Sequence, residues 1–248
     1  MKRFLKLFLC LAMVFTMLPL GKLQAAEAIE YEKSMTVYLS STGSSDLRWD
    51  SLSIFGAGAS AVKSVKSSNT SVLEVASSTG SKVSYSEVDY MDGGKESSRV
   101  SEYAYINFIP KKAGTSTISF KVGKKTYKTK VTVKKYTNPV ASVTMEGVNK
   151  GKDFSSKSKK AAFGITAKIT TSKDLSKLKV KAAKGWELTN IHYSVEESFE
   201  SISVRCSSGC TSKTVYLGPV KKGKRAYLSL NFRNTSTNGV QDVTIGLE

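Results

Sequence analysis

Apolar and polar residues alternate along much of this chain, most regularly from position 111 to 136. Nearly every second residue there is apolar or aromatic, and a turn at Gly123-Lys124 divides the segment in two. A period of two places one set of side chains in a core and the other in water, which is the pattern of a half-buried antiparallel strand. The inward set is Ile118, Phe120, Val122, Tyr127, Thr129, Val131 and Val133, and the outward set is Lys121, Lys128, Lys130 and Lys134.

Segments of this kind continue through the rest of the chain, separated by clusters of Gly, Ser, Asn and Lys, whereas helical periodicity is almost absent. The sequence therefore predicts an all-β fold built from antiparallel sandwiches. Asn138-Pro139 interrupts the pattern, so we expect one domain at 29–137 and a second at 138–248. The predicted strands cover residues 35–40, 71–77, 82–90, 100–109, 115–122, 125–133, 163–170, 177–183, 186–195, 201–206, 213–220, 226–232 and 240–247.

The first 28 residues predict an export signal. A basic start precedes an apolar run at 7–20, which is too short to span a bilayer comfortably, and small residues follow it. We expect cleavage after Ala25 or after Ala28, so that 1–28 are missing from the mature protein. That protein would have no transmembrane segment and would be secreted, held at the cell envelope by noncovalent contacts.

Two segments of the first predicted domain resemble a known family. The stretches "SSNTSVLEV" at 67–75 and "KKAGTSTISFKV" at 111–122, with a closing "KTKVTV", are similar to motifs of the bacterial immunoglobulin-like domain, group 2. Gly114 fits this likeness, because glycine can turn the chain where a Cβ would clash. Between the motifs, residues 77–103 form an excursion longer than the short hairpin that the family usually has.

This resemblance covers about residues 62–135 and implies an immunoglobulin-like sandwich with a role in cell-surface adhesion or as a spacer. The second predicted domain, with seven predicted strands, suits an immunoglobulin or fibronectin type III sandwich, although no motif identifies its family. The fold class is thus two tandem immunoglobulin-like antiparallel β-sandwich domains after a cleaved signal peptide.

The chain is strongly basic, with 38 Lys and Arg residues against 20 Asp and Glu and a net charge of +18. Such an excess attracts polyanions through long-range fields and counterion release. For an exported protein these are anionic cell-wall polymers, lipid headgroups and acidic glycans. No nucleic-acid recognition motif accompanies the charge, so we expect no specific nucleic-acid partner. The alternative is that the lysines only keep the surface soluble and the strand edges unpaired.

The second predicted domain carries half of this excess, with 18 basic and nine acidic residues. In "KLKVK" three lysines share one strand face, and "KKGKR" forms a second cluster. A regular run of lysines can also be simply a solvated face. The residues that we expect to contact an anionic partner are Lys177, Lys179, Lys181, Lys221, Lys222, Lys224 and Arg225.

The excursion at 77–103 is rich in serine, tyrosine and acidic residues. If Ala104 and Ile106 face the core, the tyrosines that alternate with them face outward, where they offer rigid contact area and a polar tip. The alternative is that this extension packs its tyrosines onto its own domain. The tyrosines that we expect to contact a glycan or surface protein are Tyr85, Tyr90, Tyr103 and Tyr105. Whether Glu87, Asp89 and Asp92 bind Ca²⁺ stays open, and no cofactor or metal is predicted.

Cys206 and Cys210 frame the sequence "CSSGC". Outside the cell two nearby thiols tend to oxidise, so we predict a structural disulfide, with a redox or metal pair as the alternative. The chain has one histidine, His192, and shows no nucleophile motif around it. No residue is predicted to be catalytic, and we expect a protein that is not an enzyme.

The sequence thus favours an exported, non-enzymatic binding or adhesion module whose basic faces are attracted to anionic envelope polymers or glycans. Two other classes remain open. One is a structural spacer or scaffold subunit with no ligand of its own, and the other is a hydrolase, or an inhibitor of one, that carries no recognisable motif.

Overall fold

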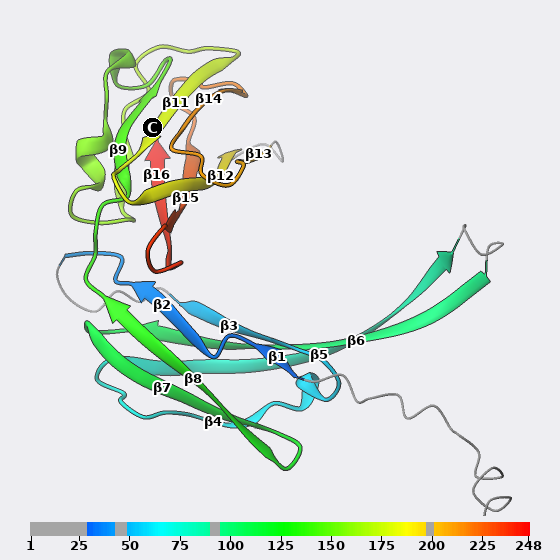
Figure 1. Ribbon diagram of the computed structural model, residues 1–248. Helices are drawn as coiled ribbons and strands as arrows, with labels where there is room; N and C mark the ends of the chain where they lie inside the picture. Colours follow the sequence, from blue (N-terminus) through cyan, green and yellow to red (C-terminus); the bar gives the residue numbers. More distant parts are fainter. Residues whose placement is uncertain (1–28, 43–48, 90–94, 197–200) are drawn as a thin grey trace, which may run out of the picture.

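The computed structural model of the protein describes residues 29–42, 49–89, 95–196 and 201–248, without the side chains of 85–89 and 95–99. The signal-peptide prediction lies outside these residues. Within them the chain forms strands and short 3₁₀ turns, as the alternation predicts, and no α-helix. We call residues 29–137 the first half and 138–248 the second half. Figure 1 shows each half as a layered β structure, with the second half above the first.

The first half contains two sheets that face each other. One has the strand order β1-β3-β6-β5, and the other has the order β2-β8-β7-β4. Its elements are β1 (Glu30–Tyr31), β2 (Ser34–Tyr38), β3 (Asp50–Phe55), η1 (Ala59–Ala61), β4 (Lys63–Ser67), β5 (Leu73–Asp89), β6 (Lys95–Pro110), β7 (Gly114–Val122) and β8 (Lys125–Lys134).

The second half repeats this plan. A three-stranded sheet with the order β14-β11-β9 faces a sheet with the order β13-β12-β15-β16, to which β10 is added. Its elements are β9 (Val140–Met145), η3 (Asn149–Gly151), η4 (Ser155–Ser158), β10 (Ile165–Ala167), β11 (Ser176–Ala182), β12 (Trp186–Val195), β13 (Ser201–Arg205), β14 (Ser212–Leu217), β15 (Ala226–Asn234) and β16 (Val240–Leu247).

Each half encloses its own cluster of buried apolar side chains. Ile118, Phe120 and Val131 are fully buried in the first, as their alternation predicts, and Leu178, Tyr193 and Phe232 lie in the second. These cores make the chain a pair of β-sandwiches. Whether residues 29–137 and 138–248 each fold alone stays a prediction.

Several details differ from the sequence expectation. Strands β1, β3, β4 and β9 were not predicted, and the strand expected at 163–170 shortens to the three residues of β10. Among the described strands, three pairings are parallel instead of antiparallel, namely β2 with β8, β10 with β16, and β16 with β2. In each half a parallel pair therefore joins a short early strand to the last long one.

The two halves are joined through β2. Val37 on this strand pairs with Val240 of β16, which makes one sheet continuous across the junction. Alternation along β2 then places neighbouring residues in different cores, because Val37 belongs to the first-half cluster and Tyr38 to the second-half cluster. The Tyr38 ring lies 5.0 Å from the Trp186 ring, and its hydroxyl is 3.1 Å from Thr237 Oγ1.

The close approach of β16 to β2 depends on Gly239. A Cβ at this position would lie 2.8 Å from both Thr36 O and Tyr38 Cε2, which is closer than a Cβ approaches other atoms in folded proteins. Beyond β2, the backbone N–H of Ala162 donates to Ser40 O at 2.6 Å. The junction is therefore packed and hydrogen-bonded on both sides of β2.

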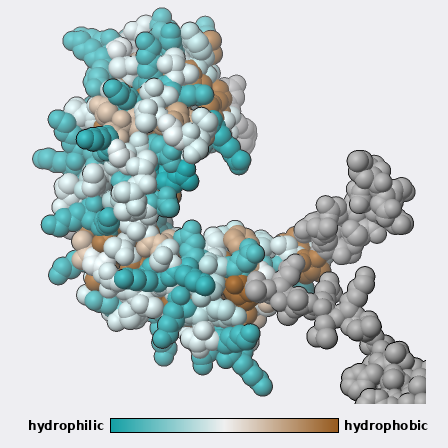
Figure 2. Space-filling model, in the orientation of Figure 1, coloured by the Kyte–Doolittle hydropathy of each residue, from teal (hydrophilic) through white to brown (hydrophobic). Residues whose placement is uncertain are grey.

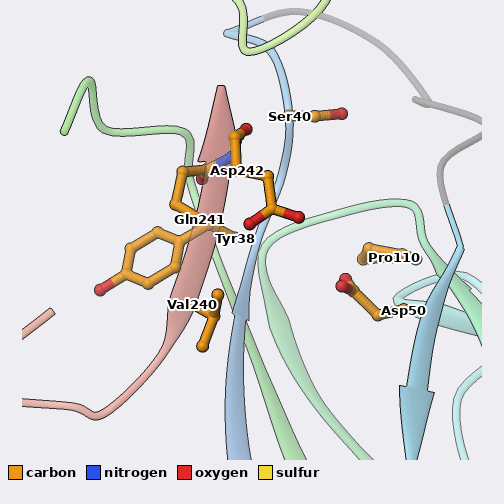
Figure 3. Close-up of a pocket in the computed structure, with 7 residues that line it drawn as sticks. All are labelled: Tyr38, Ser40, Asp50, Pro110, Val240, Gln241 and Asp242. Atoms are coloured by element: carbon orange, nitrogen blue, oxygen red, sulfur yellow. The ribbon is translucent and has the colours of Figure 1, made fainter. Parts of the chain in front are cut away.

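A small hollow lies at this junction, lined by residues of β2, β3, β6 and β16 (Figure 3). Its volume of about 40 Å³ is close to that of one water molecule and far below the 300–1,000 Å³ of small-molecule sites. We therefore regard the hollow as a packing feature of the junction. The lining residues are Tyr38, Ser40, Asp50, Pro110, Val240, Gln241 and Asp242.

Candidate functional site

The central strand of the three-stranded sheet carries the lysines singled out by the sequence. Along β11, Leu178 and Val180 are buried, so Lys177, Lys179 and Lys181 point to the other, solvent side. We call these three residues the lysine column. Successive members stand about 6.7 Å apart, because a strand rises about 3.3 Å per residue.

The register of the sheet sets a row of hydroxyl groups on each side of this column. On β9, Thr144 is opposite Lys179 and Ser142 is opposite Lys181. On β14, Thr214 and Ser212 take the corresponding places. Side chains directly opposite each other in a sheet have Cβ atoms about 4.5–5.5 Å apart. Lys179 and Lys181 are therefore each flanked by two hydroxyl groups, which we call the hydroxyl rows: Ser142, Thr144, Ser212 and Thr214.

Tyr216 completes this surface, because the register places it opposite Lys177. The tyrosine is 56% exposed, and the Lys177 ammonium group lies 5.6 Å from the centre of its ring, within the range of a cation–π contact. We call the whole surface, made of the lysine column, the hydroxyl rows and Tyr216, the lysine face. Figure 2 shows hydrophilic residues spread over the visible surface of the second half, among residues of intermediate hydropathy.

Negative charge is scarce around the lysine column. Among the described residues, no ion pair joins a carboxylate to Lys177, Lys179 or Lys181. Glu146 lies at one end of the column, where its Oε2 accepts the backbone N–H of Lys177 at 3.4 Å. Three like charges at this spacing repel one another, by at most about 0.6 kcal/mol per adjacent pair in water. A polyanion would replace this repulsion with attraction.

The second basic cluster follows β14 as an exposed loop. The backbone N–H of Lys222 donates to Ser172 Oγ at 3.1 Å, and Lys173 pairs with Val220 in an isolated bridge. These contacts hold the loop beside the segment that precedes β11. The loop thus extends the basic surface past the Lys177 end of the column, with Lys221, Lys222, Lys224 and Arg225 all exposed.

The tyrosines belong to a different part of the molecule. Tyr103 and Tyr105 lie on β6 of the first half, with ring centres 5.6 Å apart in an edge-on arrangement. Ala104 beside them is fully buried and Tyr105 is 39% exposed, the orientation that the alternation predicts. The structure describes only the backbone of Tyr85, and Tyr90 lies outside the described residues. Binding by these tyrosines stays a prediction.

The excursion at 77–103 is a long hairpin of β5 and β6. Pairing of β6 with β3 ends at Tyr103, whereas pairing with β5 continues to Lys95. The outer part of the hairpin therefore projects beyond the sandwich as a two-stranded ribbon (Figure 1). Tyr103 and Tyr105 lie on the first half and the lysine face lies on the second half, and the structure does not bring these two tyrosines to the lysine face.

Two other sequence hypotheses concern metal binding and catalysis. The side chains of Glu87 and Asp89 are not described and Asp92 lies outside the described residues, so Ca²⁺ binding there stays open. Elsewhere in the described chain no cluster of three His, Cys, Asp or Glu side chains could hold a metal ion. His192 lies on β12 opposite Ser203 and Ser229, and no contact in the described residues links it to a carboxylate.

The CSSGC loop holds its two cysteines as free thiols in the structure, so the predicted disulfide is not formed in it. Cys210 Sγ donates to Ser212 O at 3.3 Å. Burial and the adjacent Cys210 raise the pKa of Cys206 to about 11. At neutral pH this thiol is therefore protonated and reacts slowly, since the thiolate is the reactive form.

We still expect the exported protein to oxidise this pair, because Cys210 is close enough to Cys206 to contribute to its raised pKa, and neighbouring thiols tend to oxidise outside the cell. Intact mass after alkylation without reductant should then show no label on Cys206 or Cys210. The small ring should stabilise the fold by about 2 kcal/mol at most. Alkylation of both residues in protein collected from the oxidising medium would contradict the disulfide.

Glu187 anchors the same loop from β12. Its Oε2 accepts the backbone N–H of Gly209 at 2.6 Å, and its Oε1 accepts Arg233 Nε at 2.5 Å. The Gly209 hydrogen bond, followed by the Arg233 contact, lowers the pKa of this buried carboxyl. The carboxylate form thus fixes the loop to the sheet.

This lowered pKa predicts a pH dependence of stability. The contribution of Glu187 is complete above the pKa of a glutamate in the unfolded chain, and it is lost as the pH falls from there through the lower folded pKa. We expect Glu187→Gln to lower the urea midpoint at pH 7 and to weaken its dependence on acid pH. Glu146→Gln, on the exposed surface, is the control. An unchanged acid profile in Glu187→Gln would refute this role.

Comparison with known proteins leaves the family open. No family model matches the sequence, so membership in the group 2 bacterial immunoglobulin-like family is not shown. No curated protein matches it either. Among the described residues no helix is both long and apolar enough to cross a membrane.

Some solved structures share a distant likeness. Domains 4–9 of the surface layer protein SbsC match at 18% identity and a TM-score of 0.29, over 90% of this chain and 32% of that one. Zebrafish RET cadherin-like domains 1 to 4 match at 6% identity and a TM-score of 0.28, over 90% and 52%. A chimeric titin Z1Z2 tandem matches at 12% identity and a TM-score of 0.24, over 89% and 97%. The chain thus spans about a third of the SbsC chain, and likenesses this distant carry no conclusion about function.

Proposed function

We propose that this protein is an exported, non-enzymatic module that holds to anionic polymers of the cell envelope through the lysine face. The supporting observation is the lysine column, three adjacent ammonium groups on a sheet surface with no carboxylate paired to them among the described residues. The basic loop at 221–225 enlarges the charged area. Attraction of this kind is long-ranged and needs no shaped pocket.

The sequence supplies the location. A signal peptide at 1–28 would bring the chain across the membrane, and the net positive charge would then retain it at a negatively charged envelope. A role as a spacer is a second candidate, favoured by the sheet that runs continuously from one half to the other through β2 and β16. A spacer without a ligand would keep its location after the lysine column is reversed in charge.

Salt elution tests the proposal. The mature chain, 29–248, should bind isolated envelope material at about 0.1 M salt and be released at about 0.5 M, where the screening length falls to a few ångströms. Retention that is unchanged at the higher salt concentration would reject charge attraction as the mechanism.

A further inference from the structure

We propose that the polymer bound by the lysine face is an acidic polysaccharide, a chain of sugar rings that carry carboxylate or sulfate groups. The inference rests on the proposed function and narrows it, because the ammonium groups alone would serve any polyanion equally well. The other groups on the lysine face are the ones that select sugar.

The first of these is Tyr216. An aromatic residue that is 56% exposed gives up the stabilisation that burial would provide. The ammonium group of Lys177 lies over the ring, 5.6 Å from its centre, and this cation–π contact favours one orientation of the tyrosine. The flat C–H surface of a sugar ring can stack on such an aromatic face, whereas a polyphosphate chain offers no apolar ring surface.

The second is the pair of hydroxyl rows. Within the described residues no hydrogen bond engages the side-chain oxygen of Ser142, Thr144, Ser212 or Thr214. Hydroxyl groups elsewhere in the chain often bond within the protein, as Thr189 does with Asn231 O at 3.0 Å and Thr235 with Gly185 O at 3.2 Å. The hydroxyl rows therefore keep both donors and acceptors available for sugar hydroxyl groups.

The dimensions of the lysine face suit an extended polymer. The lysine column spans about 13 Å along β11, and the three strands together are about 10 Å across. This open surface is lined on both sides by hydrogen-bonding groups. An extended chain can lie along it, with its acid groups at the ammonium groups and its hydroxyl groups at the flanking rows.

The test compares three immobilised polymers: polygalacturonate, polyphosphate and uncharged dextran. The protein is the mature chain, 29–248, at about 0.1 M salt. The variants are Tyr216→Ala, Tyr216→Phe and the double variant Lys179→Ala/Lys181→Ala. Tyr227→Ala is the matched control, because this tyrosine is 38% exposed on β15 of the opposite sheet. Circular dichroism confirms that each variant is folded.

We expect the wild type to bind polygalacturonate more tightly than polyphosphate and to ignore dextran. Tyr216→Ala should weaken polygalacturonate binding about tenfold and polyphosphate binding less than twofold, while Tyr216→Phe and Tyr227→Ala bind both polymers like the wild type. If the lysine variant binds neither polyanion but Tyr216→Ala binds both with the affinity of the wild type, the polysaccharide inference is wrong and the proposed function stands. If the lysine variant binds both like the wild type, the proposed function itself fails.

Discussion

Replacing both Lys179 and Lys181 with glutamate is expected to abolish retention of the mature protein on anionic envelope material. Each lysine near an anionic surface contributes about 1 kcal/mol, so removing both charges costs about 2 kcal/mol, or about 30-fold in affinity. Introducing two carboxylates adds repulsion of similar size and brings the loss to about 1,000-fold. Both side chains are exposed, so the fold should survive the exchange. Affinity for a purified acidic polymer, measured at about 0.1 M salt, gives the result.

The control must change the same net charge elsewhere. Lys128 and Lys130 on β8 of the first half are equally exposed, and they stand on a strand face of the same alternating kind. The double exchange Lys128→Glu/Lys130→Glu should reduce binding by much less, because its charges lie outside the lysine face. Equal losses in the two variants would mean that the protein binds through its overall charge, and the site as described would then be wrong.

Replacing Tyr38 with alanine should destabilise the second-half core by about 3 kcal/mol, the low end of the cost of removing a buried aromatic ring. The ring is 8% exposed and packs against Trp186, and its hydroxyl pairs with Thr237. Tyr38→Phe keeps the ring and should cost about 1 kcal/mol for the lost hydrogen bond. The urea midpoint followed by Trp186 fluorescence measures both effects, in a Trp49→Phe background that leaves one tryptophan.

The neighbouring residue supplies the matched control for the junction. Val37 is 5% exposed on the same strand but belongs to the other core. Val37→Ala should therefore shift the Trp186 transition less than Tyr38→Ala does. If the two substitutions move that transition equally, or if Tyr38→Ala leaves it in place, the placement of Tyr38 in the second-half core would be refuted.

Alternation predicted most of the long strands that have one buried face and one exposed face. The hairpin of β7 and β8 is an example. Its residues alternate from Ile118 to Lys134, and the buried and exposed faces of the hairpin are those that the alternation predicts. Short strands were missed even where they alternate: β3 buries Leu52 and Ile54 and exposes Ser51 and Phe55, yet no strand was predicted there. The segment Val140–Met145 directly follows Pro139, so its sequence suggests part of the linker between the two predicted domains. In the structure it forms β9 at the edge of the three-stranded sheet.

The candidate site also has one part that the sequence predicts and one part that it does not. The lysine column lies within one strand, so its common face follows from period two alone. The hydroxyl rows and Tyr216 come from β9 and β14, and only the order and register of the sheet place them beside the lysines. The alternation in "SKTVYL" marks Thr214 and Tyr216 as outward residues, but it does not say which strand lies next to them. Pairing between distant segments is a tertiary property that a single sequence does not encode locally.

The contacts at the junction of the two halves could not be predicted from the sequence, for a related reason. Tyr38 reads as one more residue of the first domain, because nothing in its surroundings in sequence distinguishes the two faces of β2. Its place opposite Trp186 depends on the approach of β16, which in turn depends on the absence of a side chain at Gly239.

The salt dependence of binding tests the lysine face most directly. The logarithm of the affinity for an acidic polymer should fall linearly with the logarithm of salt concentration, with a slope of about −0.9 for each lysine engaged on a densely charged duplex-like polymer and less on a weaker one. Lys179→Ala/Lys181→Ala should make this slope shallower by the share of two lysines, about 1.8 on a duplex-like polymer and less on a weaker one, whereas Lys128→Ala/Lys130→Ala should leave it unchanged. A slope that stays the same in the first variant would contradict binding through the lysine column.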